Sequence, residues 1–147
     1  MKQFKHLGAY GLILDNDNIV LIKKNGGPYN GKLDLPGGTI EFGETPEETL
    51  VRELEEEVGI EVLEYELFDG NSVTFEWEHK GELEQGHHIG FFYKITKYNN
   101  SINNNIELSD KNDDSLGAQF YNISKLSKSD LSLIAALELE KLGYKLD

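Results

Sequence analysis

Apolar and polar positions at the start of the chain alternate in short blocks that are typical of paired strands. The stretch from His6 to Leu14 is rich in apolar residues, and Ile19 to Ile22 forms a second apolar run. Between them, Asp15 to Asn18 supplies four consecutive turn-forming residues. This order predicts a β-hairpin, and the glycine- and asparagine-rich segment 25–31 predicts a loop after it.

The pattern changes to helical spacing further along the chain, where residues 46–58 predict a helix with signals at both ends. Thr45 is a favourable N-cap, and Pro46 suits the first helical position because its missing N–H has no partner there. Glu48 completes a Thr-x-x-Glu capping box. Gly59 follows the last apolar residue, where a glycine commonly ends a helix.

Two faces of this predicted helix differ in chemistry. Apolar residues at three- and four-residue spacing form a stripe that we expect to be buried, namely Leu50, Val51, Leu54 and Val58. Glu53, Glu56 and Glu57 crowd their carboxylates on another patch, and the helix contains Arg52 as its one cation. A solvated acidic surface is one interpretation. The other is a hard divalent cation with oxygen ligands, which would offset the repulsion.

The turn Pro36-Gly37-Gly38 precedes this helix. Because Gly37 and Gly38 have no Cβ atom, the backbone can bend sharply there and bring a carbonyl close to an ion or a phosphate. Taken alone, the segment is also consistent with a simple turn. Its fixed distance from the glutamates favours a shared site.

The last third of the chain predicts a strand, a loop and a final helix. Residues 89–95 read as a strand, and the asparagine-rich stretch 99–105 reads as a loop. Ser127 or Ser129 is expected to cap the final helix, whose apolar face carries Leu131, Ile134, Ala135, Leu137, Leu139 and Leu142. Most aromatic side chains, Phe42 among them, are expected to pack in the core.

Composition narrows the class of protein. The 147 residues suit a single domain, which we expect to cover 1–147. The formal net charge of -13 argues against a nucleic-acid partner, although carboxylates that hold Mg²⁺ can still bind a phosphate-containing substrate. The absence of cysteine excludes disulfides and a cysteine nucleophile. No apolar stretch has the length of a membrane span and no signal peptide is evident, so we expect a cytoplasmic protein with no membrane partner.

One motif resembles a known family. The residues Gly38-x5-Glu44-x7-Arg52-Glu53-Leu54-x-Glu56-Glu57-x-Gly59-Ile60 match every defined position of the Nudix box, here residues 38–60. The flanking Leu35-Pro36-Gly37 and the segment 120–126 are also similar to the Nudix hydrolases, including the MutT-like pyrophosphohydrolases. Leu33 departs from the family pattern, since many members carry a tryptophan there.

The resemblance implies a fold, an activity and a set of site residues. The fold would be an α/β/α sandwich with a mixed β-sheet between helices. Glu53, Glu56 and Glu57 would bind Mg²⁺ or Mn²⁺ with the carbonyl of Gly37 or Gly38. The catalytic set would comprise Arg52, Glu44, Glu53 and Glu56, with Arg52 orienting the glutamates and Glu53 or Glu56 taking the proton of the attacking water. The activity would be hydrolysis of a phosphoanhydride in a nucleoside diphosphate linked to another group.

Several alternatives stay open from the sequence. A nucleoside triphosphate, including an oxidised purine form, is the first choice of substrate, followed by ADP-ribose or a nucleotide sugar and then a dinucleoside polyphosphate. A non-catalytic nucleotide sensor and an acidic calcium-binding or interaction module are the rival functions. The candidates for a further base or metal ligand are Glu82, Glu84, Glu107, Asp110, Asp113 and Asp114, with a solvated surface acid as the default interpretation of each. His87 and His88 are candidates for contacting substrate, and the oligomeric state is open.

Overall fold

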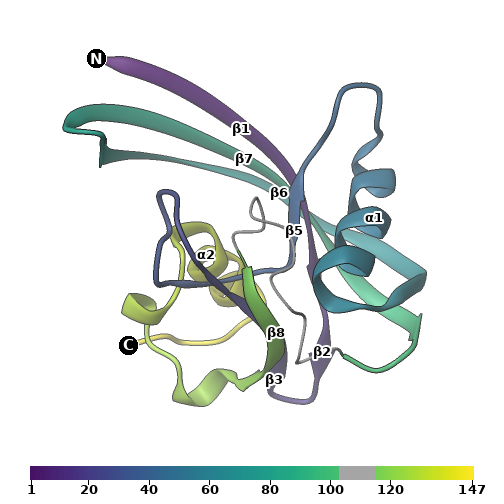
Figure 1. Cartoon of the computed structure of the whole chain (residues 1–147). Coiled ribbons are helices and arrows are strands. Elements are labelled where there is room, and N and C mark those ends of the chain that lie inside the picture. Colours follow the sequence, from purple (N-terminus) through teal and green to yellow (C-terminus); the bar gives the residue numbers. More distant parts are fainter. Residues whose placement is uncertain (103–114) are drawn as a thin grey trace.

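The computed structural model describes residues 1–102 and 115–147, whose strands form two sheets (Figure 1). The first sheet has the order β5-β1-β7-β6, in which β1 and β7 are parallel and the other pairs antiparallel. In the second sheet, β3 lies between β2 and β4 in the path and also pairs with β8. The strands are β1 (Lys2–Leu12), β2 (Leu14–Asp15), β3 (Asn18–Lys24), β4 (Leu33–Asp34), β5 (Gly37–Thr39), β6 (Glu61–His79), β7 (Glu82–Asn99) and β8 (Ser115–Asn122). The helices are α1 (Pro46–Val58) and α2 (Leu133–Lys141), with short 3₁₀ turns at Ile123–Lys125 and Lys128–Asp130.

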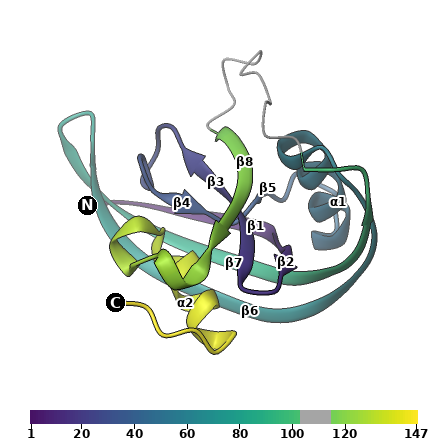
Figure 2. The same ribbon diagram turned by 90° about the horizontal axis from the view of Figure 1, so that it is seen from below.

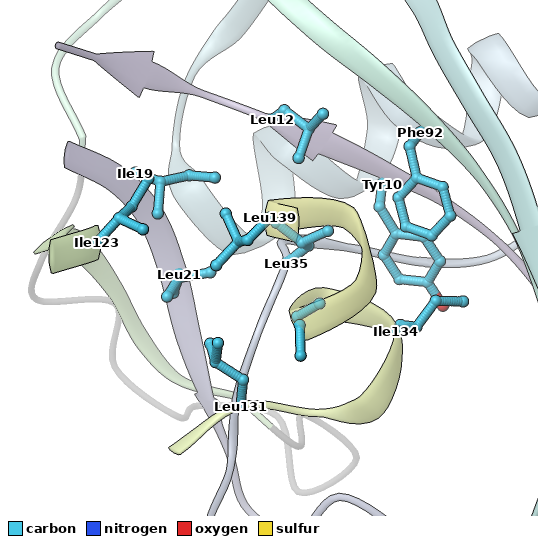
Figure 3. Close-up of a cluster of buried hydrophobic side chains, with 12 residues drawn as sticks. Tyr10, Leu12, Ile19, Leu21, Leu35, Phe92, Ile123, Leu131, Ile134 and Leu139 are labelled. Atoms are coloured by element: carbon cyan, nitrogen blue, oxygen red, sulfur yellow. The ribbon is translucent and has the colours of Figure 1, made fainter. Parts of the chain in front are cut away.

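Two hydrophobic cores lie on opposite faces of the strands, because neighbouring residues of a strand point to opposite sides. Ala9 on β1 and Val20 on β3 are buried in the core that contains α1. The adjacent Tyr10 and Ile19 are buried in the core that contains α2. Figure 3 shows this second core, which the α2 side chains join, among them Ile134 and Leu139. The expected α/β/α arrangement with a mixed sheet is therefore confirmed.

Helix α1 begins and ends at the residues predicted. Thr45 accepts a hydrogen bond from the Glu48 N–H, and the Glu48 side chain accepts one from the Thr45 N–H, so the capping box is complete. Gly59 ends the helix with a left-handed φ of 82°, and its N–H donates to the carbonyls of Leu54 and Glu55. In the apolar stripe, Val51 is half-buried, whereas the other three residues are fully buried.

Helix α2 begins later than predicted. Its N-cap is Ser132, whose Oγ accepts a hydrogen bond from the Ala135 N–H. Neither Ser127 nor Ser129 caps this helix, and Ser127 instead precedes the 3₁₀ turn at Lys128–Asp130. The reason is a contact distant in sequence: Leu131 forms a parallel β-bridge with Leu33 of β4, which keeps its backbone extended before the helix can start.

The predicted strand 89–95 is part of a much longer hairpin. Strands β6 and β7 pair along almost their whole length and are joined at Lys80 and Gly81, whose φ values are 52° and 79°. Strand β1 runs beside β7 from Lys2 to Leu12. Together, these strands extend past the two helices as a projecting arm, which Figures 1 and 2 show from two sides. In the described residues no helix is long and apolar enough to cross a membrane.

Candidate active site

Strand β5 lies at the base of the candidate site and contains Gly37 and Gly38, so we call it the glycine strand, or glycine floor. In β5, Gly37 pairs with Tyr10 and Gly38 with Ala9 of β1. A Cβ at Gly37 would overlap the carbonyl oxygen of Ala9, and its φ of 146° disfavours other residues. A Cβ at Gly38 would lie 2.5 Å from the carboxyl carbon of Glu53. Both glycines are therefore needed for close approach, one to β1 and the other to the glutamate helix.

Arg52 organises the acidic side chains around this floor. Its Nε and Nη2 atoms donate to the two carboxylate oxygens of Glu44 at 2.8 Å each, which is a bidentate pair. Its Nη1 atom donates to Glu53 at 2.8 Å, and its Nη2 atom donates to the carbonyl of Thr39 at 3.2 Å. The same guanidinium thus ties the loop before α1 to the first glutamate of the predicted metal set.

The other two glutamates occupy different surroundings. Glu57 is buried, and its Oε1 accepts a hydrogen bond of 2.8 Å from the Gly37 N–H. Glu56 has 59% of its side chain exposed and lies 3.5 Å from Nη1 of Arg52. Within residues 1–102 and 115–147, no three acidic or histidine side chains converge closely enough to hold one ion. Helix α1 therefore brings the glutamates beside the glycine strand without assembling them into one ligand cluster.

Electrostatics distinguish the two carboxylates that Arg52 contacts. Hydrogen bonding from Arg52, helped by the Glu41 N–H, lowers the pKa of Glu44 to about 2. Burial raises the pKa of Glu53 above its usual value, and the neighbouring Glu56 adds to this rise while Arg52 opposes it. Glu44 is thus a permanent anion that holds Arg52, whereas Glu53 is a desolvated carboxylate whose charged form gains from a further cation.

The donor chemistry fits a hard divalent cation. Carboxylate oxygens and backbone carbonyls are the ligands that Mg²⁺ and Mn²⁺ take in proteins. The carboxylate of Glu53 lies directly on Gly38, and Glu57 is fixed to the adjacent Gly37. Glu56 lies one helical turn after Glu53 on α1, with 59% of its side chain exposed. The residues present therefore suit such an ion at the junction of β5 and α1.

His87 and His88 point to opposite faces of β7, as expected for neighbours in a strand. His88 is buried: its Nε2 is 2.6 Å from the Tyr10 hydroxyl and its Nδ1 is 3.0 Å from the Tyr29 hydroxyl. Burial, then the charges of His6 and Lys24, lower the pKa of His88 to about 3, so it is neutral at physiological pH. His88 thus links two tyrosines beside the glycine strand. Sequence reasoning missed both tyrosines, because partners so distant along the chain leave no local signal.

His87 lies on the arm, where it lines a surface cavity of about 660 Å³ with Lys5 and Thr74. The acids Glu82 and Glu84 also lie on the arm. Glu84 pairs with Lys2 across the sheet and forms an ion pair with it at 3.8 Å.

The positions of these two acids test their predicted role in the metal shell. Lys2 is six residues from Gly8, the partner of Thr39, which places Glu84 about 20 Å from the glycine floor along β1. Glu82 lies still further out along the arm, so neither of these two candidates lies at the glycine floor. The other candidates, Glu107, Asp110, Asp113 and Asp114, are outside the described residues. Phe42, expected in the core, is fully exposed in the loop between β5 and α1.

The fold and the site together define a class of protein. It is an α/β sandwich in which the glutamate-rich helix α1 packs against the glycine strand, and Arg52 links the glutamates to Thr39 of that strand. Residues 4–138 match the family model described as "NUDIX domain". The chain therefore belongs to the NUDIX family, as the motif at 38–60 indicated. NUDIX hydrolases generally need a divalent metal ion.

Two relatives have similar sequences over part of their length. The chain is 42% identical over 79 residues to an 8-oxo-dGTP diphosphatase from Escherichia coli, covering 47% of this chain and 61% of that protein. It is 48% identical over 50 residues to an ADP-ribose pyrophosphatase from Methanocaldococcus jannaschii, covering 34% of this chain and 30% of that protein. In both cases the chain spans less than two thirds of the relative.

Solved structures support the fold over nearly the whole chain. A MutT NUDIX hydrolase from Burkholderia pseudomallei superposes with a TM-score of 0.75 at 22% identity, covering 95% of this chain and 98% of that one. A mutator MutT protein from Bacillus halodurans gives a TM-score of 0.69 at 20% identity, covering 96% and 84%. At these identities the likeness concerns the fold alone.

Proposed function

We propose that the chain is a metal-dependent pyrophosphohydrolase that cleaves a nucleoside triphosphate to the monophosphate and pyrophosphate. The observation that carries this proposal is the position of Glu53. Its carboxylate is desolvated, lies against Gly38 and is oriented by Arg52, which Glu44 holds from the other side. A purely solvated acidic surface would require neither the glycine contact nor the arginine bridge.

In this proposal Glu53, Glu56 and Glu57, with the carbonyl of Gly37 or Gly38, hold Mg²⁺ or Mn²⁺. The bound ion supplies neutralisation of the phosphate charge and a lower pKa for the attacking water. Arg52 keeps Glu53 in place, and the Gly37 N–H keeps Glu57 in place.

The reaction itself requires a base. The oxygen of a water molecule forms a bond to phosphorus while the bridging P–O bond breaks and pyrophosphate leaves. Glu53 or Glu56 accepts the proton of that water.

The relatives support a nucleoside triphosphate as substrate. The similarity to the 8-oxo-dGTP diphosphatase extends over more of the chain than the similarity to the ADP-ribose pyrophosphatase. ADP-ribose or a nucleotide sugar is therefore the second candidate, and dinucleoside polyphosphates the third. Action as a single domain on a small nucleotide, in the cytoplasm and without a nucleic-acid partner, is part of the same proposal.

The test is product analysis by chromatography with Mg²⁺ or Mn²⁺ present. The panel contains ordinary and 8-oxo nucleoside triphosphates, ADP-ribose, nucleotide sugars and diadenosine polyphosphates. Glu53→Gln and Glu57→Gln are compared with Glu55→Gln, a matched control because Glu55 is an exposed glutamate of the same helix. We expect one class to be split at a phosphoanhydride by the wild type and by Glu55→Gln, with turnover nearly abolished in the other two variants.

Two results would contradict the proposal. Equal activity of Glu53→Gln and Glu55→Gln would show that Glu53 takes no part in catalysis and that the active site is assigned wrongly. Nucleotide binding without cleavage under either metal would favour the non-catalytic sensor.

A further inference from the structure

A buried carboxyl group joins α2 to the long strand β6, far along the fold from the glutamate helix. Glu138 of α2 is completely buried, and its Oε2 accepts a hydrogen bond of 3.3 Å from the Asn71 side chain. Asp69 lies beside it on β6, where its Oδ2 accepts a hydrogen bond of 2.6 Å from Lys141. Figure 2 shows α2 lying next to β6.

The second oxygen of Glu138 has no conventional partner. Its Oε1 is buried and receives no hydrogen bond from any donor in the described part of the chain. The carboxyl of Asp69 also interacts with Glu138, and this group is itself an acceptor when ionised. An ionised, buried oxygen facing another carboxylate is strongly unfavourable. One proton between the two groups turns the repulsion into a hydrogen bond and satisfies the oxygen.

We propose that Glu138 is protonated in the folded protein, donates a hydrogen bond to Asp69, and acts as a pH-sensitive latch between α2 and β6. Burial, followed by the hydrogen bond and the negative charge of Asp69, raises the pKa of Glu138 to about 7. The pKa of Asp69 is lowered, despite the opposing effect of its own desolvation, by hydrogen bonds from Lys141 and Glu138. The shared proton thus resides on Glu138.

The charged groups around the pair fit this arrangement. From α2, Lys141 contacts Asp69, and from β6 the facing acid is Asp69 itself. On β7, the residue opposite Asp69 is the apolar Phe92, and Lys94 two positions on lies over the Phe68 ring at 4.8 Å.

A further acid, Asp34 on β4, contacts the start of α2. Asp34 accepts a hydrogen bond of 2.7 Å from Ser132 at the start of the helix, more than one helical turn from Glu138. Its carboxylate is therefore engaged at the other end of α2.

Loosening of α2 would affect the candidate active site through the hydrogen bonds between Ser132 and β4. The Ser132 N–H donates to the carbonyl of Leu33, and its hydroxyl donates to Asp34. These two residues form β4, which leads within three residues to Gly37. The latch therefore stabilises the strand that precedes the glycine floor.

The direction of the pH effect follows from the raised pKa. The folded protein keeps the proton on Glu138 up to about pH 7, whereas the unfolded chain releases it near its ordinary value of 4.5. The stabilisation is complete below the lower value and is lost as the pH rises through the higher one. The stability therefore changes between about pH 4.5 and about pH 7, and little further change from this site is expected above that range.

The experiment measures urea unfolding of the full chain from about pH 5 to pH 8 for wild type, Glu138→Gln and Glu140→Gln. The glutamine amide donates to Asp69 at every pH, so Glu138→Gln should lose the pH dependence that this site causes. Glu140 is an exposed acid on the same helix, paired with Lys128, and serves as the matched control. Relative to Glu138→Gln, the unfolding equilibrium constant of wild type and of Glu140→Gln should rise on the order of 100-fold across the range.

A second measurement keeps the proposal testable if Glu138→Gln does not fold. In Asp69→Asn the repulsion is removed, so the Glu138 carboxyl, followed by ¹³C NMR, should titrate at a lower pH than in wild type. Parallel pH profiles for wild type and Glu138→Gln would overturn the latch. So would a wild-type Glu138 that titrates at the ordinary value of a glutamate.

Discussion

The glycine pair beneath α1 offers a substitution that separates catalysis from folding. In Gly38→Ala, the added Cβ would lie 2.5 Å from the carboxyl carbon of Glu53, and 2.6 Å and 2.7 Å from its two oxygens. An ordinary contact begins near 3.4 Å, so the Glu53 carboxylate must move by roughly 0.9 Å. The atoms that move are the end of a flexible side chain, and the backbone at Gly38 is not in the left-handed region.

The expected result is a large loss of activity with little loss of stability. A displacement of about 1 Å at a catalytic group costs on the order of 100-fold in kcat/KM. Stability should stay within about 1 kcal/mol of wild type, because alanine also reduces the entropy of the unfolded chain by about 0.4–1 kcal/mol. Urea unfolding and pyrophosphate release with Mg²⁺ measure the two quantities on the same protein.

Two other glycines, Gly37 on β5 and Gly70 on β6, give controls of opposite kind. Gly37→Ala should fail to fold stably, because its Cβ would overlap the Ala9 carbonyl and its φ of 146° suits only glycine. Gly70→Ala should be nearly neutral, since the nearest atom is the Gly90 carbonyl oxygen at 4.0 Å. Full activity of Gly38→Ala would refute the reasoning about Glu53. If Gly38→Ala were destabilised as severely as Gly37→Ala, the inference that the Glu53 side chain moves and the backbone does not would be refuted.

Two further predictions concern the cores on either face of the sheet. His88→Phe should destabilise the protein by about 1–3 kcal/mol, because the buried hydroxyl of Tyr10 and that of Tyr29 lose their imidazole partner. Since the pKa of His88 is lowered from 6.5 to about 3, wild type should lose stability as the pH falls through this range and the variant should lose less, which urea unfolding against pH will show. Leu54→Ala should cost about 2–5 kcal/mol, because Leu54 is fully buried against Gly11, and an unchanged urea midpoint would contradict this packing.

Tertiary contacts explain where the sequence-based expectations were wrong. The start of α2 was misplaced because Leu131 is held extended by Leu33, nearly a hundred residues earlier. The sequence could not choose among the acidic candidates outside the motif, because nothing local shows how far β1 and β7 continue past the helices. In the sequence, Glu84 looks like any other surface acid, and only the register between β1 and β7 shows that it pairs with Lys2.

The sequence by itself determined helix α1 and the family, because their signals act over a few residues. Of the predicted first hairpin only the short pair of β2 and β3 forms, because the run from His6 to Leu12 pairs with β5 and β7 instead. The capping box, the terminating Gly59 and the motif spacing are all read within one segment. Only the tertiary structure decided which distant groups meet: Tyr10 with His88 across 78 residues, and Asn71 with Glu138 across 67. Those contacts depend on strand register and on burial, which raise or lower a pKa only once the chain has folded and water is excluded.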